Sequence, residues 1–198
     1  MTNPLKKSPR ILLLTSKLEL SPTGGREMLC KLNYDVLANI YGEELFVLEI
    51  KKHSNHAAKT SINTVIKGYI DGVNANVVNK LLHIIDINNI SKIFVDGSNF
   101  GEIVKQVKLK YPTIKIYTFF HNVEFRFFLG SLKERKSLRA LAVCLANYLV
   151  EKKAVRYSDK IICLSERDSK LLKIIYGRNA THKSAMALED KLPSSILS

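Results

Sequence analysis

Two adjacent glycines, Gly24 and Gly25, follow an apolar run at residues 11–16 and precede a stretch with helical periodicity. Glycine has no Cβ, so a ligand can come close to the backbone at such a turn. The N-terminus of the following helix directs unpaired N–H groups and the positive end of its dipole toward the same place. This arrangement predicts a site for a phosphate or another anion, although paired glycines also occur in ordinary turns.

His121 stands at the end of a β-rich run at residues 115–120, beside Asn122 and close to Glu124. A histidine inside a strand is usually a hydrogen-bonded core residue. At the end of a strand, its imidazole can exchange protons near neutral pH with a bound ligand. We therefore expect His121 to be functional, whereas the spacing of the remaining histidines and of the three cysteines predicts no metal site.

Other polar residues also stand at the ends of predicted strands. In an open parallel sheet, ligands bind beyond the carboxyl ends of the strands, so these residues should line one cleft. Each also has a structural explanation, because Asp96-Gly97-Ser98 is typical of a turn and Ser165 of a helix N-cap. The residues that we expect to line the cleft are Ser16, Asp96, Ser98, Ser165 and Glu166.

Short β-rich runs alternate with helical stretches along the chain. The runs at 11–14 and 161–164 are apolar without alternation, which is typical of strands covered on both faces. The pattern predicts an α/β fold: a Rossmann-like, doubly wound, mostly parallel sheet with helices on both faces. The predicted strands span 11–16, 45–50, 92–96, 115–120 and 160–164, with a last edge strand at 184–188, and the predicted helices span 25–41, 61–71, 74–86, 100–110, 134–157 and 166–176.

Aromatic and basic residues alternate at the start of the segment 125–139. A basic helical turn with exposed aromatics suits anionic lipid headgroups, and aromatics among arginines could equally stack nucleic-acid bases. No zinc-finger, RNA-recognition or helix-turn-helix pattern accompanies them. The predicted helix 134–157 carries leucines on one face, most of which we expect to be core. The residues that we expect to contact a membrane are Phe125, Phe127, Phe128, Lys133, Arg135, Lys136 and Arg139.

Composition limits the class of protein. The 198 residues carry a net charge of +13, which attracts polyanions, anionic lipid or anionic small molecules. The basic charge is concentrated at 126–160, where nine Lys/Arg face three acidic residues. The three cysteines form no disulfide pattern, so we expect reduced, buried thiols. No segment reaches the roughly 18–20 apolar residues that cross a bilayer.

Several segments together resemble family 4 glycosyltransferases of the surface-polysaccharide type. They are SPTGGRE at 21–27 with CKLNYD at 30–35, YTFFHNVE at 117–124, and AVRYSDKIICLSERD at 154–168. Their order and spacing match across nearly the whole chain. The resemblance implies the N-terminal, acceptor-side half of a retaining GT-B enzyme over residues 1–190, followed by a tail or the start of an interdomain linker at 191–198. The donor-binding C-terminal domain would be absent, and this half alone should be inactive.

The resemblance also implies roles for individual residues. Gly24 and Gly25 would abut the donor phosphates, and His121 would be the catalytic residue near the reacting centre. The charge of the departing nucleoside diphosphate would be stabilised by helix N-termini and basic groups, so no metal or other cofactor is expected. The residues implied to hold the acceptor are Asn122, Glu124 and Arg126.

The partners implied are a nucleotide-sugar donor, a glycan or lipid-linked acceptor, an anionic membrane surface and the missing second domain. Apolar surface left without that domain could also produce self-association. The implied location is cytoplasmic, at the inner face of the plasma membrane. The alternative is a basic Rossmann-like module that binds nucleic acid or another polyanion. A nicotinamide-dependent oxidoreductase is disfavoured, because the first turn lacks G-x-G-x-x-G spacing.

Overall fold

The computed structural model describes residues 9–16, 18–19, 21–51 and 67–185. Its centre is a six-stranded, all-parallel sheet in the order β2-β1-β3-β4-β5-β6. The strands are β1 (Ile11–Thr15), β2 (Leu45–Glu49), β3 (Lys92–Asp96), β4 (Lys115–Phe120), β5 (Lys160–Cys163) and β6 (His182–Lys183). The strand order reverses between β1 and β3, where a doubly wound sheet opens a crevice. The predicted α/β, Rossmann-like fold is confirmed.

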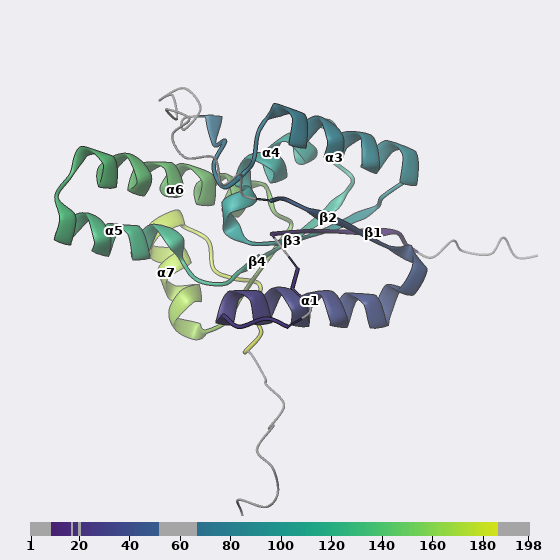
Figure 1. The fold of residues 1–198 in the computed structure, drawn as a ribbon, viewed down its shortest axis with the longest axis horizontal. Coiled ribbons are helices and arrows are strands. Elements are labelled where there is room, and N and C mark those ends of the chain that lie inside the picture. Colours follow the sequence, from purple (N-terminus) through teal and green to yellow (C-terminus); the bar gives the residue numbers. More distant parts are fainter. Residues whose placement is uncertain (1–8, 17, 20, 52–66, 186–198) are drawn as a thin grey trace, which may run out of the picture.

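Helices cover both faces of the sheet (Figure 1). The α-helices are α1 (Gly25–Tyr41), α3 (Ala75–Asn88), α4 (Gly101–Lys110), α5 (Glu124–Arg135), α6 (Leu138–Tyr157) and α7 (Glu166–Tyr176), and the 3-10 turns are η1 (Gly42–Glu44) and η2 (Ser98–Phe100). In β1, Leu12 and Leu14 pack into the core formed with α3 and α4, whereas Ile11 and Leu13 pack on the α1 side. β1 is therefore buried on both faces, as its run of consecutive apolar residues predicted.

The predicted helix at 134–157 is wrong in its first turn. A helical hairpin takes its place: α5 ends at Arg135, the C-cap Lys136 is in a left-handed conformation (φ 43°), and α6 begins after Ser137. The Ser137 hydroxyl accepts the Ala140 N–H over 3.1 Å, which is the usual N-cap contact and starts a new helix. The segment 125–129 lies within α5, because its aromatic and basic residues are also compatible with a helix.

The last strand, β6, begins two residues before the predicted position and pairs with β5. Most of the predicted helix 61–71, most of the predicted edge strand 184–188 and the predicted tail at 191–198 lie outside the described residues. Over the part of the chain that the structure describes, no helix combines the length and hydropathy of a membrane span.

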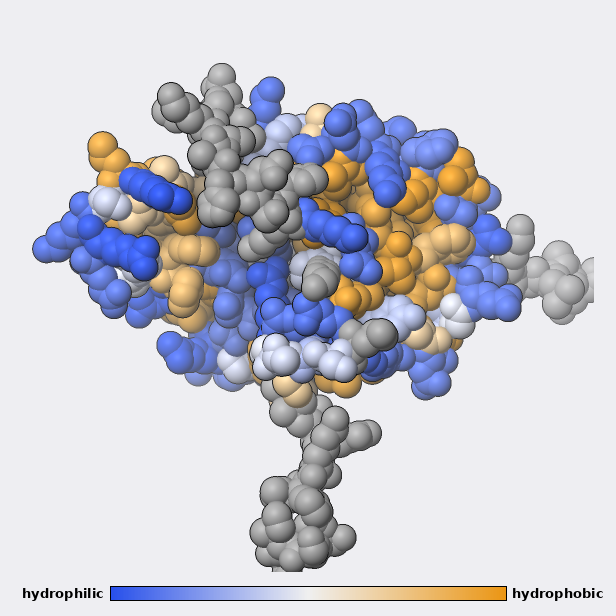
Figure 2. All heavy atoms as spheres, viewed as in Figure 1, coloured by the Kyte–Doolittle hydropathy of each residue, from blue (hydrophilic) through white to orange (hydrophobic). Residues whose placement is uncertain are grey.

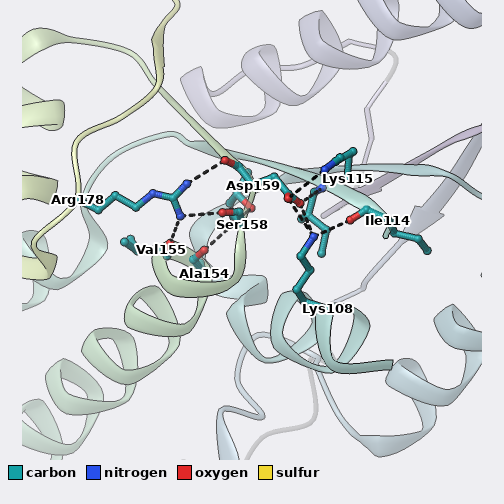
Figure 3. Close-up of polar contacts among 10 residues, drawn as sticks. Lys108, Ile114, Lys115, Ala154, Val155, Ser158, Asp159 and Arg178 are labelled. Carbon is teal, nitrogen blue, oxygen red and sulfur yellow. Dashed lines mark hydrogen bonds and ion pairs between the residues drawn. The ribbon is translucent and has the colours of Figure 1, made fainter. Parts of the chain in front are cut away.

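One polar network joins the end of α6 to β4, β5 and α4 (Figure 3). Arg178 donates to the carbonyl oxygens of Val155, Ser158 and Asp159 at 2.7–2.9 Å. The Asp159 carboxylate accepts from Lys108 at 2.8 Å. Helix C-termini expose unpaired carbonyls, and a guanidinium satisfies several of them at once. This network fixes the point at which the hairpin returns to the sheet.

Candidate functional site at the strand ends of β1, β3 and β4

Asp96, the last residue of β3, is the centre of a polar cluster at the crevice between β1 and β3. Its side chain is completely buried. Thr15 Oγ1, at the end of β1, donates to Asp96 Oδ2 over 2.8 Å. Asn33 Nδ2, from α1, donates to Asp96 Oδ1 over 2.9 Å. A buried carboxylate requires such partners, and these two fix its orientation.

His121 meets this carboxylate from the end of β4. Its Nε2 lies 2.9 Å from Asp96 Oδ1, and the side chain is 8 % exposed. The ring N–H is not aligned for a hydrogen bond, so the contact is an ion-pair distance rather than a well-formed hydrogen bond. The ring also packs edge-on against Phe119, with 5.3 Å between the centroids. The imidazole is therefore held on two sides.

Cys30 is the third titratable group of the cluster and comes from α1. Its side chain is buried, and its Sγ lies 3.8 Å from Ser16 Oγ. Burial and the neighbouring Asp96 carboxylate raise the pKa of the Cys30 thiol to about 12. Both causes act against the thiolate, because a second negative charge would be buried beside the first. The group is therefore a neutral thiol at physiological pH.

Asp96 remains ionised although it is buried. Burial raises the pKa of Asp96, but the adjoining His121 imidazole, the Cys30 thiol and the Thr15 hydroxyl together lower it below its usual range. These polar neighbours together stabilise the carboxylate more than desolvation destabilises it. The site thus holds one buried negative charge at the edge of the sheet.

The N-terminus of α1 lies beside this cluster. Arg26 Nη2 donates to Asn99 Oδ1 over 3.3 Å, which joins the diglycine turn to the loop after β3. Gly24 is the N-cap, and a Cβ on Gly24 would come within 2.1 Å of the Glu27 carboxylate. Around Gly25 the space is open, with nothing within 4 Å of a Cβ built there. An anion approaching this N-terminus would therefore compete with the Glu27 side chain for space.

The other predicted cleft residues occupy different surroundings. Ser98 is buried, and its hydroxyl contacts Glu151, where it partly opposes the burial that raises the pKa of that carboxyl group. The Ser165 hydroxyl accepts the Asp168 N–H over 3.1 Å and is the N-cap of α7, and Glu166 pairs with Lys183. The polar contacts of Ser165 and Glu166 are therefore local to α7 and β6.

The three predicted acceptor residues follow His121 into the first turn of α5. Asn122 and Arg126 are exposed, and Glu124 is half-buried. The backbone N–H groups of Glu124 and Phe125 each donate to the buried Glu151 carboxylate of α6 at 2.9 Å. Burial raises the pKa of Glu151, although these hydrogen bonds and one from Tyr176 oppose that effect. An internal carboxylate thus already occupies the N-terminus of α5.

The α5–α6 hairpin carries the predicted membrane-contact residues. Lys133, Arg135, Lys136 and Arg139 are all exposed, as is Phe127 at 65 %, while Phe125 and Phe128 are half-buried. Phe125 packs edge-on against Tyr148 of α6. Figure 2 shows hydrophilic surface at the tip of the hairpin, with apolar patches beside it. Basic and apolar groups therefore share one end of the molecule.

The predicted burial of the α6 leucines is wrong. Leu138 is 86 % exposed, and Leu141 and Leu145 are also exposed. The buried face of α6 instead includes Cys144 and Val150. The hairpin projects from the sheet, and the first half of α6 lies alongside α5 (Figure 1). A hollow of about 350 Å³ lies near the hairpin turn, separate from the Asp96 cluster, and is lined by Phe128, Ser131, Arg135, Ser137, Arg139, Ala140 and Val143.

Sequence reasoning missed three members of the cluster: Thr15, Cys30 and Asn33. A signal for two of them is present, because Arg26, Cys30 and Asn33 follow helical i, i+4, i+7 spacing and share one face of α1. That face meets the carboxyl end of the sheet. Cys30 was predicted to be a buried, reduced thiol, which is confirmed for all three cysteines, but its polar neighbours depend on the packing of α1.

The cluster can hold a proton or a cation at one place. The buried Asp96 charge orients and attracts a cationic group, and His121 is the member that can exchange protons with a bound molecule. Comparison with known proteins does not identify the chain, because no family model matches it and no curated protein matches it significantly.

Proposed function

We propose that this chain is the acceptor-side domain of a retaining glycosyltransferase that moves a sugar from a nucleotide-sugar donor to a glycan or lipid-linked acceptor. The observation that carries the proposal is the meeting of three strand-end features at the crevice. Arg26 joins the diglycine turn to the β3 loop, and Asp96 of β3 contacts His121 after β4. A crevice at the reversal of strand order is where doubly wound sheets bind nucleotide-like ligands.

The surroundings of Gly25 support approach by a ligand. Gly25 is the first residue of α1, and its φ angle is not positive. No neighbouring atom within 4 Å excludes a Cβ there. Neither the backbone nor the packing of the described residues therefore requires glycine at this position. A phosphate lying against the N-terminus of α1 would require it, since a side chain would fill that space.

The environment of His121 supports a role at the reacting centre. Sugar transfer needs charge stabilisation where the leaving phosphate and the acceptor hydroxyl meet. The Asp96 carboxylate lies 2.9 Å from Nε2 and helps to hold the ring in place at the crevice. In this proposal the imidazole faces the donor phosphates or the acceptor hydroxyl, while Asn122, Glu124 and Arg126 at the start of α5 hold the acceptor.

The hairpin supplies a membrane contact in this proposal. Exposed Phe127 and Leu138 lie on the two helices of the hairpin, close in sequence to exposed basic side chains such as Arg135 and Arg139. Apolar groups that enter the headgroup region and cations that meet anionic lipid are the two components of interfacial binding. The hairpin would place the crevice near a lipid-linked acceptor at the inner face of the plasma membrane.

The test is a transfer assay with a panel of nucleotide sugars, using this chain extended through a second, donor-binding domain. We compare the wild type with His121→Ala, Gly25→Ala and Gly25→Val. Gly130→Ala is the matched control, because Gly130 also has nothing within 4 Å of a Cβ and lies outside the crevice. Loss of transfer in the Gly25 and His121 variants, with normal rates in Gly130→Ala, supports the proposal.

Unchanged transfer in both His121→Ala and Gly25→Val would remove these residue assignments. Absence of transfer with every nucleotide sugar, together with tight and salt-sensitive binding of random oligonucleotides, would favour the nucleic-acid module instead.

A further inference from the structure

We propose that Cys30, Asp96 and His121 form a binding site for a transition-metal ion, and that Zn²⁺ fits the site best. The spacing of these residues along the sequence gives no sign of it, and the expectation from sequence was that no metal binds. The fold brings the three together at the carboxyl edge of the sheet, from α1, from the end of β3 and from the residue after β4.

The donor atoms are close enough to share one ion. One ligand atom from each residue lies within 4.8 Å of the other two. Around a tetrahedral Zn²⁺, nitrogen and oxygen ligands stand about 3.3 Å apart, and a sulfur stands about 3.6 Å from either. His121 Nε2 and Asp96 Oδ1 are now 2.9 Å apart. To bind the ion, the imidazole and the carboxylate would have to move apart by a few tenths of an ångström. The Cys30 sulfur would have to move toward both of them by a similar or larger distance.

The imidazole supplies an independent indication of a missing ligand. Among the described residues, neither buried ring nitrogen of His121 makes a well-formed hydrogen bond: Nε2 has only the Asp96 oxygen 2.9 Å away, and Nδ1 has no hydrogen-bond partner. Buried polar atoms in native proteins are nearly always paired, so an unpaired one needs an explanation. A metal ion bound by one nitrogen would provide it, because coordination replaces the hydrogen bond.

Neighbouring residues hold the carboxylate as a metal ligand needs to be held. Thr15 Oγ1 and Asn33 Nδ2 donate to the two oxygens of Asp96 at 2.8 and 2.9 Å. Groups of this kind orient the ligands and are needed for tight metal binding. Ser16 Oγ lies 3.8 Å from Cys30 Sγ, on the half-buried side of the cluster. In the proposal, a water molecule completes the coordination from that side.

The donor set selects the type of ion. A thiolate, an imidazole and a carboxylate are the three ligand types of protein zinc sites, whereas Mg²⁺ and Ca²⁺ take oxygen ligands. Binding replaces the thiol proton of Cys30, which passes to solvent, with the metal ion. Three protein ligands with one open position are typical of zinc sites that bind a further small molecule.

The experiment titrates the metal-free chain with Co²⁺ and follows the near-ultraviolet charge-transfer band of a thiolate bound to cobalt. We expect the band to saturate at one equivalent per chain and to disappear when Zn²⁺ is added. Cys30→Ser should abolish the band, and His121→Gln should weaken binding at least tenfold. Asn33→Ala should weaken binding by about 10–100-fold, as loss of a group that orients a ligand does.

Cys144→Ser and Cys163→Ser are the matched controls, because both thiols are buried and neither belongs to the cluster. Both variants should bind Co²⁺ like the wild type. A second measurement needs no variant: Zn²⁺ should slow alkylation of Cys30 in the urea-unfolded-and-refolded chain and in the native chain more than that of Cys144 or Cys163, as located by mass spectrometry. Absence of a saturable thiolate–cobalt band, or a band that persists in Cys30→Ser, would overturn the proposal.

The inference does not rest on the proposed function, although both involve His121. The titration uses the chain by itself and measures no sugar transfer. If the chain binds no metal, the transfer proposal is unaffected. If the chain binds metal but the extended chain shows no sugar transfer, the metal site stands and the transfer proposal fails.

Discussion

Thr15 Oγ1 donates a 2.8 Å hydrogen bond to Asp96 Oδ2, and both side chains are completely buried. The two residues are 81 positions apart in sequence and end neighbouring strands of the sheet. This bond joins β1 to β3 at the point where the strand order reverses. The candidate site is therefore also part of the buried framework of the domain.

Removal of the Thr15 hydroxyl should destabilise the protein. Thr15→Val keeps the shape of the side chain but leaves one Asp96 oxygen without its donor, and loss of a partner for a buried charged group costs about 1–3 kcal/mol. Urea denaturation should show this decrease in the free energy of unfolding. Thr15→Ser is the control that retains the hydroxyl, and it should recover most of the loss. Equal stability of the valine and wild-type chains would contradict the role of this bond.

Stability should decrease in acid because of Asp96. Its folded-state pKa is lowered, so its contribution is fully present above the unfolded value of about 3.9 and is lost as the pH falls through the folded value. The difference in urea midpoint between wild type and Asp96→Asn should therefore narrow as the pH falls from about 5 toward 2. A difference that stays constant over this range would show that Asp96 does not titrate as proposed.

Cys30 should react slowly with thiol reagents in the native protein. Its pKa of about 12 leaves only about one thiolate in ten thousand at pH 8. In a chain carrying Cys144→Ser and Cys163→Ser, we expect labelling of Cys30 to require opening of the fold and to be fast in urea. Asp96→Asn removes the neighbouring negative charge and should accelerate labelling. Rapid labelling of the native single-cysteine chain would contradict the burial of this thiol.

The hairpin should bind anionic vesicles through its basic tip. Changing Arg135, Lys136 and Arg139 together to Gln should reduce co-sedimentation with phosphatidylserine vesicles by tenfold or more, since each basic residue near the surface contributes about 1 kcal/mol. The melting temperature should change little, because all three side chains are exposed.

The charge-matched control for the hairpin changes Arg167, Lys170 and Lys173 of α7, which are also exposed, to Gln. Vesicle binding should persist in that variant. An equal loss from both triple variants would indicate attraction by total charge, and not a contact made by the hairpin.

The sequence by itself determined the fold class and most of the elements. Runs of apolar residues without intervening polar ones identify strands that are buried on both faces. The helices at 25–41 and 166–176 begin and end where predicted, because helix caps and hydrophobic periodicity are local properties of the sequence. The prediction of one helix at 134–157 was wrong, because the chain forms the α5–α6 hairpin there. The break at Lys136 and Ser137 is signalled weakly, and the exposure of Leu138 depends on the hairpin projecting away from the sheet.

Only the tertiary structure decided which side chains meet. The sequence predicted that the residues at the strand ends would line one edge of the sheet. Asp96 does contact His121, because β3 and β4 are neighbouring strands. Ser165 and Glu166 instead make their contacts within α7 and with β6. Cys30 and Asn33 join the site because α1 packs on the sheet with that face inward. Strand order and helix rotation arise from burial summed over the whole chain, so no single segment of sequence encodes them.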